Sequence, residues 1–379
     1  MMQPLKDTCG RIFLTVFITL LNLGFSQADF SGYLESDAEW IKSHNTRYLG
    51  YNKFRLDIEG PVSGSATVYS SVTATQFTGK TDWLIEDFVT APDLDGIPFE
   101  FKDTLGLDFL YAVVKFHKAD ITFGKQPIAM GSGYTWNPGD IFNRKDMLDP
   151  TYELTGVNAL RVQFPLRSSE ADIIVKPEDD GRHSSLYAGL NTQLGSVDLN
   201  LAGYHRFLEL SPAAISGRGI VVNFSGELMG IGIRGELNHF QHEDGDYGGL
   251  SWLTGFDYTF RTSTFVMLEI YHNQFGSDWN DATGYSADPV LNYISGEVPT
   301  LAQDYWFGLL QHPIGELSSF SLWSIYNQND NSFLFSPQLN LDLLENTEIN
   351  ISVYHFSGET GTEFSAQDYG ARIRARLYF

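Results

Sequence analysis

Three arginines occupy alternate positions near the C-terminus, Arg372, Arg374 and Arg376, within the segment ARIRARLYF. Alternate residues of a β-strand lie on the same face, so a strand here would carry a row of three guanidinium groups. On the inside of a pore, such a row attracts anionic or polar solutes. Nearby acids such as Asp57 and Glu348 could instead pair with these arginines and only keep that face soluble. The sequence leaves both interpretations open, and with them the sign of any charge selectivity.

Residues able to perform catalysis are scarce. The sequence has no G-x-S-x-G motif, and its single cysteine, Cys9, lies in an N-terminal segment that we expect to be removed. His239 and His242 precede acidic residues, but their H-x-x-H spacing differs from the i, i+4 pair of a zinc-enzyme helix. We therefore predict no catalytic residue, no metal site and no cofactor. The alternative is a serine–histidine pair on an outer wall, as in barrel phospholipases. The candidate histidines for such a pair are His205, His272 and His355.

The elements that would position these residues are β-strands with one apolar and one polar face. In KFRLDIEG, Phe54, Leu56 and Ile58 alternate with charged residues, and SVDLNLAGYHR and EINISVYHF show the same period of two. Successive strand residues point to opposite faces, so each segment has an apolar and a polar wall. The residues that we expect to line a pore are Lys53, Arg55, Arg161, Arg234, Glu236, Asp257, Arg372, Arg374 and Arg376. The same alternation adds Asp57, Asn200, Tyr204, Glu269 and Asn350 to the polar wall.

Turn signals and alternation together predict an all-β chain of about eighteen strands, with sixteen or fourteen as alternatives. The predicted strands are 30–36, 47–60, 64–78, 106–117, 120–130, 156–166, 171–176, 184–193, 196–206, 218–228, 231–241, 249–261, 264–274, 304–313, 317–327, 333–343, 347–357 and 367–379. The first of them has the weakest pattern. An even number of strands puts both ends of the barrel-forming segment on the same side.

A soluble β-sandwich would show the same alternation, but three features favour a single transmembrane antiparallel β-barrel. Turns are alternately very short, as at 194–197, and long, as at 275–303, which is typical of outer-membrane barrels. The last predicted strand ends on the aromatic Phe379. Isolated arginines on the polar face suit a wet interior better than the outside of a sandwich. Aromatic residues near strand ends, such as Tyr48 and Tyr369, suit the membrane–water interface.

The N-terminus has the order of a secretory signal peptide. Lys6 and Arg11 precede the apolar stretch IFLTVFITLLNLGF, and small residues follow it. We predict a signal peptide over 1–26, with cleavage after Ser26; an N-terminal membrane anchor is the alternative. No later apolar run approaches the roughly 20 residues of a membrane helix. The net charge of −23 argues against binding nucleic acid.

The rest of the chain, 27–379, is predicted to form one domain. Within it, the stretches 79–105, 131–155 and 275–303 are long loops that could fold into the barrel. Eight-stranded barrels fill their interior with side chains, whereas sixteen to eighteen strands leave an aqueous path. The predicted strand number therefore implies a pore, unless these loops block it.

Residues 121–166 carry a family resemblance. Gly124, Lys125 and Gln126 run into Gly131, then WNPGDIFN, an acidic stretch and the returning strand GVNALR. This segment resembles alginate-export-like and related porin families of outer-membrane channel proteins. The resemblance implies a monomeric or trimeric barrel through which polar or anionic solutes diffuse, with inward-folded loops that narrow the pore. Those families usually have arginine where this chain has Lys125, and lysine lacks the planar fork that binds carboxylates bidentately.

The same segment supplies candidates for a constriction loop. They are Trp136, Asn137 and Asp140. Gly, Pro and Asn favour turns here, so a structural lid that packs aromatic rings is favoured over a binding site.

Together these features predict a porin, not an enzyme, in the outer membrane of a Gram-negative-type bacterium, with passive diffusion of small polar or anionic solutes. The alternatives are a lipase-like barrel enzyme and a gated transporter of lipids or hydrophobic compounds. The expected partners are outer-membrane lipids and lipopolysaccharide, the barrel-assembly machinery through Phe379, small polar solutes and, for a homotrimer, two further copies of the chain. Nucleic acid is not an expected partner.

Overall fold

The computed structural model describes residues 28–43, 46–143, 145, 153–178, 181–211, 213–245, 248–279 and 283–379. The predicted signal peptide, 1–26, lies outside the described residues. No helix in the described part of the chain is long and apolar enough to cross a membrane.

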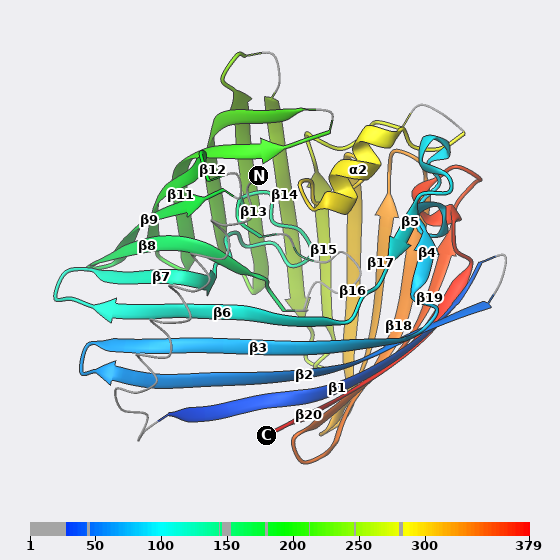
Figure 1. Cartoon of the computed structure of the whole chain (residues 1–379), viewed down its shortest axis with the longest axis horizontal. Coiled ribbons are helices and arrows are strands. Elements are labelled where there is room, and N and C mark those ends of the chain that lie inside the picture. Colours follow the sequence, from blue (N-terminus) through cyan, green and yellow to red (C-terminus); the bar gives the residue numbers. More distant parts are fainter. Residues whose placement is uncertain are drawn as a thin grey trace, which may run out of the picture.

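Eighteen antiparallel strands form one closed barrel (Figure 1). They are β1 (Asp29–Lys42), β2 (Thr46–Ser63), β3 (Ala66–Gly79), β6 (Thr104–Lys115), β7 (Asp120–Pro127), β8 (Gly156–Leu166), β9 (Ser169–Pro177), β10 (Ser184–Leu194), β11 (Val197–Glu209), β12 (Ala214–Leu228), β13 (Ile231–His242), β14 (Gly248–Thr259), β15 (Phe265–His272), β16 (Asp304–Gly315), β17 (Ser318–Asn327), β18 (Ser332–Leu344), β19 (Thr347–Ser357) and β20 (Tyr369–Tyr378). Each pairs with its neighbours along the chain, and β1 also pairs with β20. Closure leaves no unpaired edge, which a hydrocarbon environment would not tolerate.

The predicted strand number and fold class are confirmed, and each predicted strand overlaps one observed strand. Two bounds differ. The first strand continues to Lys42, because Glu35, Asp37 and Glu39 all lie on its inner face and depress its apparent hydropathy. Strand β7 ends at Pro127 instead of 130, since proline has no N–H with which to extend the ladder.

The two ends of the barrel differ in their connections. At one end the strands are joined by short turns; Met229 and Gly230 both have positive φ there, as a two-residue hairpin turn requires. Residues Asp29 and Phe379 lie at this end. The other end carries the long loops, which contain β4 (Asp82–Leu84), η1 (Ile85–Asp87), η2 (Pro92–Leu94), β5 (Pro98–Glu100), α2 (Ala287–Ser295) and η3 (Glu363–Ser365). In Figure 1, α2, β4 and β5 lie towards the end of the barrel that carries the long loops.

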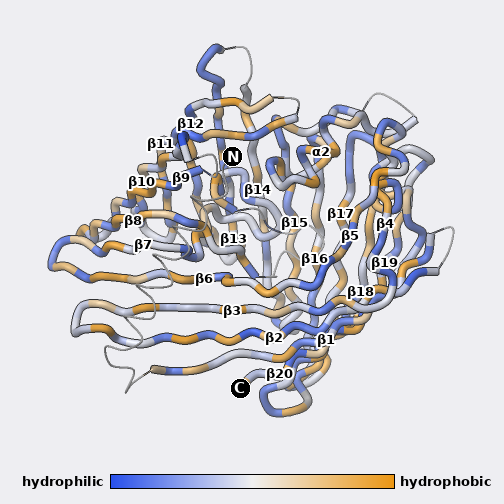
Figure 2. Tube along the Cα trace, in the orientation of Figure 1, coloured by the Kyte–Doolittle hydropathy of each residue, from blue (hydrophilic) through white to orange (hydrophobic). Residues whose placement is uncertain are grey.

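Large apolar side chains cover the outside of the barrel. Along the strands orange and blue alternate in Figure 2, as the period-two pattern requires. The outward residues with 37–63% exposure include Phe30, Leu34, Phe54, Phe123, Leu160, Leu186, Leu201, Ile220, Leu237, Phe256, Leu268, Trp306, Ile351, Ile373 and Leu377. Soluble proteins rarely expose so continuous an apolar surface, whereas a barrel in lipid needs one.

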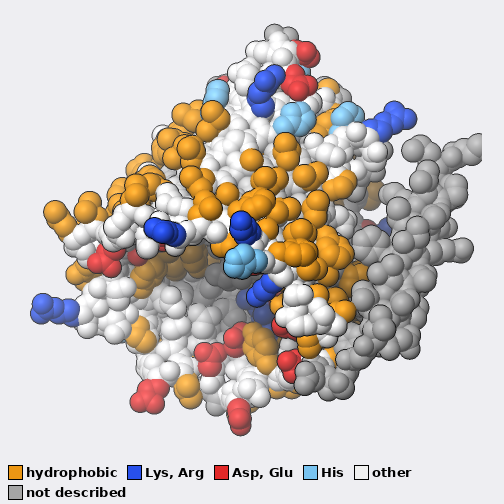
Figure 3. Space-filling view, turned by 90° about the vertical axis from the view of Figure 1, so that its left-hand side faces the viewer, with side chains coloured by type: hydrophobic (Ala, Val, Ile, Leu, Met, Phe, Trp, Pro, Cys, Tyr) orange, Lys and Arg blue, Asp and Glu red, His pale blue; other side chains and the backbone are white. Residues whose placement is uncertain are grey.

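Aromatic rings lie at the rim of this apolar surface. Trp40 and Tyr48 pack together with ring centroids 5.7 Å apart, and Tyr369 is exposed near them at the long-loop end. Tyr48 and Tyr369 lie where aromatic residues are expected at an interface with lipid headgroups. Another side of the barrel, on which the β6–β7 turn lies, is shown in Figure 3, where apolar side chains gather above a hollow in the surface.

The inside of the barrel is polar near the short turns and aromatic near the long loops. Tyr271, Tyr305, Phe307 and Trp323, from the inner faces of β15–β17, form a buried cluster with loop residues. Trp136 belongs to this cluster, so the connection between β7 and β8 must enter the barrel.

Candidate functional site

The loop between β7 and β8 lies inside the barrel and is held there by aromatic packing. Trp136 is 2% exposed and stacks on Tyr271 with ring centroids 5.2 Å apart. It also contacts Tyr305, at 5.6 Å, on the next strand. Because Tyr271 and Tyr305 point inward, these contacts place this part of the loop inside the bore; we call the described residues of the connection, 128–143, 145 and 153–155, the inner loop.

Two carboxylates of the barrel wall anchor the inner loop through its backbone. Glu236 on β13 accepts hydrogen bonds from the amides of Ser132, Gly133 (2.7 Å) and Gly139 (3.0 Å). Hydrogen bonds to a charged acceptor are stronger than neutral ones, so these anchors are strong. Gly131 adopts φ +93° here, and a Cβ at that position would come within 2.6 Å of the Glu236 carboxylate.

A second carboxylate of the barrel wall, that of Glu269, anchors the next residues of the inner loop in the same way. Glu269 on β15 accepts hydrogen bonds from the amides of Tyr134 (2.5 Å) and Thr135 (2.8 Å). Glu236 and Glu269 are 1% and 0% exposed. Glu236 was expected to line the pore; the structure places it beneath the inner loop, which it anchors instead of facing water.

Asp140 organises the inner loop from within. Its carboxylate accepts hydrogen bonds of 2.9 Å from the amides of Met130, Phe142 and Asn143. Burial raises the pKa of Asp140 to about 6, and the three amide hydrogen bonds limit that rise. Trp136 and Asp140, the predicted constriction residues, thus hold the loop in place by packing and hydrogen bonding; their part in a constriction stays a prediction.

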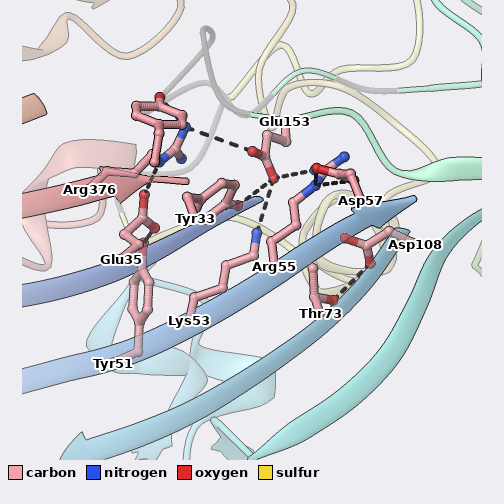
Figure 4. A network of polar contacts seen from close by, with 11 residues as sticks. Tyr33, Glu35, Tyr51, Lys53, Arg55, Asp57, Thr73, Asp108, Glu153 and Arg376 are labelled. Atoms are coloured by element: carbon pink, nitrogen blue, oxygen red, sulfur yellow. Dashed lines mark hydrogen bonds and ion pairs between the residues drawn. The ribbon is translucent and has the colours of Figure 1, made fainter. Parts of the chain in front are cut away.

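The returning end of the inner loop meets the opposite wall through Glu153 (Figure 4). One carboxylate oxygen of Glu153 accepts hydrogen bonds from Tyr33 Oη (2.8 Å), Arg55 Nη1 (2.8 Å) and Lys53 Nζ (3.2 Å). The other oxygen lies 3.8 Å from Arg376 Nη1. We call the four residues Tyr33, Lys53, Arg55 and Arg376, from β1, β2 and β20, the basic cradle.

The arginine row on β20 meets an acidic row on β1. The register pairs Arg372, Arg374 and Arg376 with Glu39, Asp37 and Glu35. Arg376 Nε lies 2.7 Å from Glu35, and Arg372 Nε lies 2.6 Å from Asp37. Pairing with acids therefore neutralises much of the row.

The acids named from the sequence have other partners. Asp57 accepts a 2.9 Å bond from Arg55 Nε, and Glu348 accepts a hydrogen bond from Tyr378. The acids that pair with Arg372 and Arg376 are Asp37 and Glu35. The sequence analysis missed them because they lie on β1, the strand with the weakest pattern.

The structure places all nine predicted lining residues on the inner face of the barrel. Besides the residues of the β1, β2 and β20 wall, Arg161 pairs with Asp172 at 2.6 Å, and Arg234 pairs with Asp257. Lys125 differs: its register partners are Leu110 and Asn158, so it shares the outer face with Phe123, and its Nζ donates to the carbonyl of Leu107.

Cavities lie on both sides of the inner loop. Towards the short turns, a cavity of about 630 Å³ is lined by residues that include Ser132, Arg161 and Asn200. A second cavity of about 410 Å³ is lined by Ser132, Arg234 and Asp257, among others. Towards the long loops, a chamber of about 90 Å³ lies against Trp136 and Lys145. The inner loop therefore separates wider polar spaces from a narrow one.

A serine, a histidine and an acid do meet on the outer face, near the long loops. Ser216 Oγ lies 2.9 Å from His205 Nε2, and Glu243 Oε1 lies 3.4 Å from the same nitrogen. In a catalytic triad the serine and the acid contact opposite ring nitrogens, so that the acid orients the base. Here both compete for Nε2, and this geometry does not form a triad.

The other candidate histidines have structural partners. His272 Nδ1 lies 2.8 Å from Asp304, and the His355 ring packs against Phe333 with centroids 6.3 Å apart. His239 Nδ1 is 3.1 Å from the carbonyl of Gly249. The residues that the structure describes contain no cluster of three or more histidine, cysteine or acidic side chains able to hold a metal ion.

The fold is similar to solved porin structures. OccK11 (OpdR) of Pseudomonas aeruginosa superposes with a TM-score of 0.58 at 9% identity, over 93% of this chain and 96% of that one. OccAB1 of Acinetobacter baumannii gives a TM-score of 0.60 at 11% identity, over 93% and 97%. Wzi of Escherichia coli, a carbohydrate-binding outer-membrane β-barrel involved in capsule assembly, gives 0.58 at 12%, over 97% and 87%. At these identities the likeness establishes the shared barrel fold alone.

Sequence comparison adds nothing to this likeness. No family model and no curated protein matches the chain. The comparisons therefore support a barrel of the porin type and give no support for the alginate-export-like family.

Proposed function

We propose that this protein is an outer-membrane channel through which small polar solutes, anions among them, diffuse passively. The observation that carries the proposal is the combination of an apolar outer surface with a charged inner wall around cavities of about 630 and 410 Å³. Barrels of sixteen to eighteen strands leave an aqueous path, which an inner loop can narrow.

The inner charges support moderate selectivity rather than a strong basic field. Several arginines of the inner wall lie beside an acidic side chain; they are Arg161, Arg234, Arg372 and Arg376. Paired charges cancel at a distance, so we expect selectivity to depend on contacts at the inner loop.

A planar-bilayer measurement on the refolded protein tests the channel. We expect stable conductance steps and a reversal potential in a KCl gradient that shows a weak ion preference. Absence of conductance from protein that is demonstrably folded would refute the proposal. A strong cation preference would refute a role for the arginine row in attracting anions.

Transport of hydrophobic compounds has one observation in its favour. A mainly apolar pocket of about 300 Å³ lies among the long loops, lined by residues that include Phe88, Phe101 and Phe364. Uptake of an apolar dye, faster than uptake of a polar dye of equal size into proteoliposomes, would favour this second function. A lipase-like activity lacks such support, because Glu243 does not orient His205.

The remaining predictions concern partners. Phe379 is exposed and stacks on Phe54 with ring centroids 6.1 Å apart at the short-turn end. This position supports recognition of Phe379 by an assembly machinery. Contact with lipopolysaccharide, assembly into a homotrimer and the finer kinship of residues 121–166 with alginate-export-like channels remain proposals.

A further inference from the structure

The apolar pocket of about 300 Å³ among the long loops is built by segments far apart in the sequence; we call it the loop pocket. Its lining includes Phe88 next to η1, Tyr293 of α2 and Phe364 of η3. The amide of Tyr285 donates to the carbonyl of Thr90 at 2.9 Å and so joins two of these loops. None of the described residues of the inner loop lines this pocket. The loop pocket is therefore a site of its own.

Three phenylalanine rings form part of the wall of the loop pocket. Phe88, Phe99 and Phe101 pack edge to face, with ring centroids 5.2 to 6.4 Å apart. Phe88 remains 36% exposed, so this wall is not sealed by the rest of the described chain. The faces of aromatic rings attract organic cations as well as apolar groups. The wall thus suits a ligand that has both.

One carboxyl group interrupts the apolar lining. Glu363 lines the loop pocket and is 6% exposed. Tyr305 Oη and Asn327 Nδ2 both donate to its Oε2, each at 2.7 Å. Its Oε1 receives no hydrogen bond within the described part of the chain. Because an unpaired polar atom in a largely buried place is costly, a ligand that pairs with Oε1 gains from that contact.

The charge around Glu363 is negative. Asp330 is 4% exposed and accepts a hydrogen bond of 2.7 Å from the amide of Glu363. In the described residues no lysine, arginine or histidine bonds to either carboxyl group. Burial raises the pKa of Glu363 to about 8, and Asp330 adds to the rise. A cation beside Glu363 would offset this cost, and the apolar lining requires that the cation carry an apolar body.

We propose that the loop pocket binds an organic ammonium ion with a small aromatic or branched apolar body. The ammonium group lies against Oε1 of Glu363, and the apolar body lies against the rings of Phe88 and Phe101. A carboxylate ligand is disfavoured, because Glu363 and Asp330 repel it. A volume of about 300 Å³ is enough for a ligand of this size. The inference does not depend on the proposed channel function, and its test requires no conduction.

A pair of isosteric probes tests the role of the charge. They are phenyltrimethylammonium and tert-butylbenzene, in which carbon replaces the charged nitrogen. Binding to the protein in lipid nanodiscs is measured by equilibrium dialysis at pH 9, where Glu363 is ionised, and is corrected with empty nanodiscs. We expect the wild type to bind the cation about tenfold more tightly than the neutral isostere, since contacts with a charged acceptor are strong.

Glu363→Gln removes the charge and keeps an acceptor for Tyr305 and Asn327. It should weaken phenyltrimethylammonium binding about tenfold and leave tert-butylbenzene binding unchanged, which also shows that the pocket is intact. Glu359→Gln is the matched control, because Glu359 precedes η3 in the same loop, is exposed and does not line the loop pocket. This control should bind both probes as the wild type does.

Phe88→Leu tests the aromatic wall without removing its apolar bulk. We expect it to weaken phenyltrimethylammonium binding about threefold, with tert-butylbenzene unchanged. Equal affinities of the wild type for the two probes, or cation binding unaffected by Glu363→Gln, would overturn the proposal; tighter binding of tert-butylbenzene would instead favour transport of hydrophobic compounds. If Glu363→Gln loses both probes, Phe88→Leu decides, and a cation affinity equal to that of the wild type would then refute the site.

Discussion

At the residue scale, the carboxylates of this barrel differ in what they accept. Glu236 and Glu269 accept hydrogen bonds from backbone amides, and Glu153 accepts them from cationic side chains. Glu363 in η3 accepts hydrogen bonds from neutral side chains. Tyr305 Oη and Asn327 Nδ2 each donate to Glu363 at 2.7 Å. No cation is among the partners recorded for Glu363 in the described residues, so its burial is not offset as that of Glu153 is.

Glu363 should make the long loops sensitive to pH. Burial raises its pKa to about 8, and nearby Asp330 contributes to the rise. The folded state thus retains a proton that the unfolded state releases near pH 4.5, and this contribution to stability is lost as pH rises from about 4.5 to 8. Amide hydrogen exchange over Glu363–Ser365, corrected for intrinsic rates, should be about tenfold slower at pH 5 than at pH 9.

Glu363→Gln is the matched variant for that experiment. Glutamine keeps an acceptor oxygen for Tyr305 and Asn327 but cannot ionise. Its corrected exchange rates should therefore be independent of pH. The same pH dependence in the variant as in the wild type would assign the effect to another group.

At the element scale, the inner loop depends on wall acids more than on its own residues. Glycines at 131, 133 and 139 bring bare amides close to Glu236, and tyrosine rings on β15 and β16 receive Trp136. The loop is thereby attached to strands that are distant in sequence. Loosening the anchors should release the loop without disturbing the barrel ladder.

Glu236→Ala should therefore enlarge the bore. It leaves three amides without their acceptor, at a cost of about 1–3 kcal/mol for each one that stays buried. We expect single-channel conductance to rise severalfold, with larger current fluctuations. Glu316→Ala, in the exposed turn between β16 and β17, is the control and should conduct as wild type. Equal conductance in both variants would mean that the inner loop keeps its position without Glu236.

The elements could be predicted from the sequence, and the course of the inner loop could not. Period-two alternation reports which face a residue occupies, and in the structure Arg234, Glu236 and Asp257 share one wall. It carries no information about which backbone amide will meet Glu236. A usable signal was present in the glycine-rich MGSGYTWNPGD segment, where bare amides need buried acceptors.

At the scale of the whole molecule, the barrel separates lipid from water by residue parity. Neighbouring residues such as Asn200 and Leu201 on β11 face opposite environments: Leu201 is 57% exposed outward, whereas Asn200 bonds Tyr187 and Asn191 inside. The entire assignment of inside and outside can be tested at such a pair.

Leu201→Lys and Asn200→Lys should have different effects in a bilayer. A lysine on the lipid face near mid-strand lowers the stability of a membrane barrel by about 2–4 kcal/mol, whereas a lysine in the lumen is solvated. We expect reversible unfolding from lipid vesicles to show this loss for Leu201→Lys and a change below about 1 kcal/mol for Asn200→Lys. Equal losses would contradict the inside–outside assignment.

The pairing of β1 with β20 has a consequence for how the wall is completed. The register places the acids of β1 opposite the arginines of β20: Glu35 against Arg376, Asp37 against Arg374, and Glu39 against Arg372. The strand pair that closes the barrel is therefore acidic on β1 and basic on β20. A shift of one residue would turn the arginines towards hydrocarbon, which makes the charge pattern a check on alignment during closure. A polypeptide truncated before β20 would keep the acidic residues of β1 without their arginine partners, and β1 would be an unpaired edge strand. We expect such a fragment to be degraded by proteases faster than the full chain.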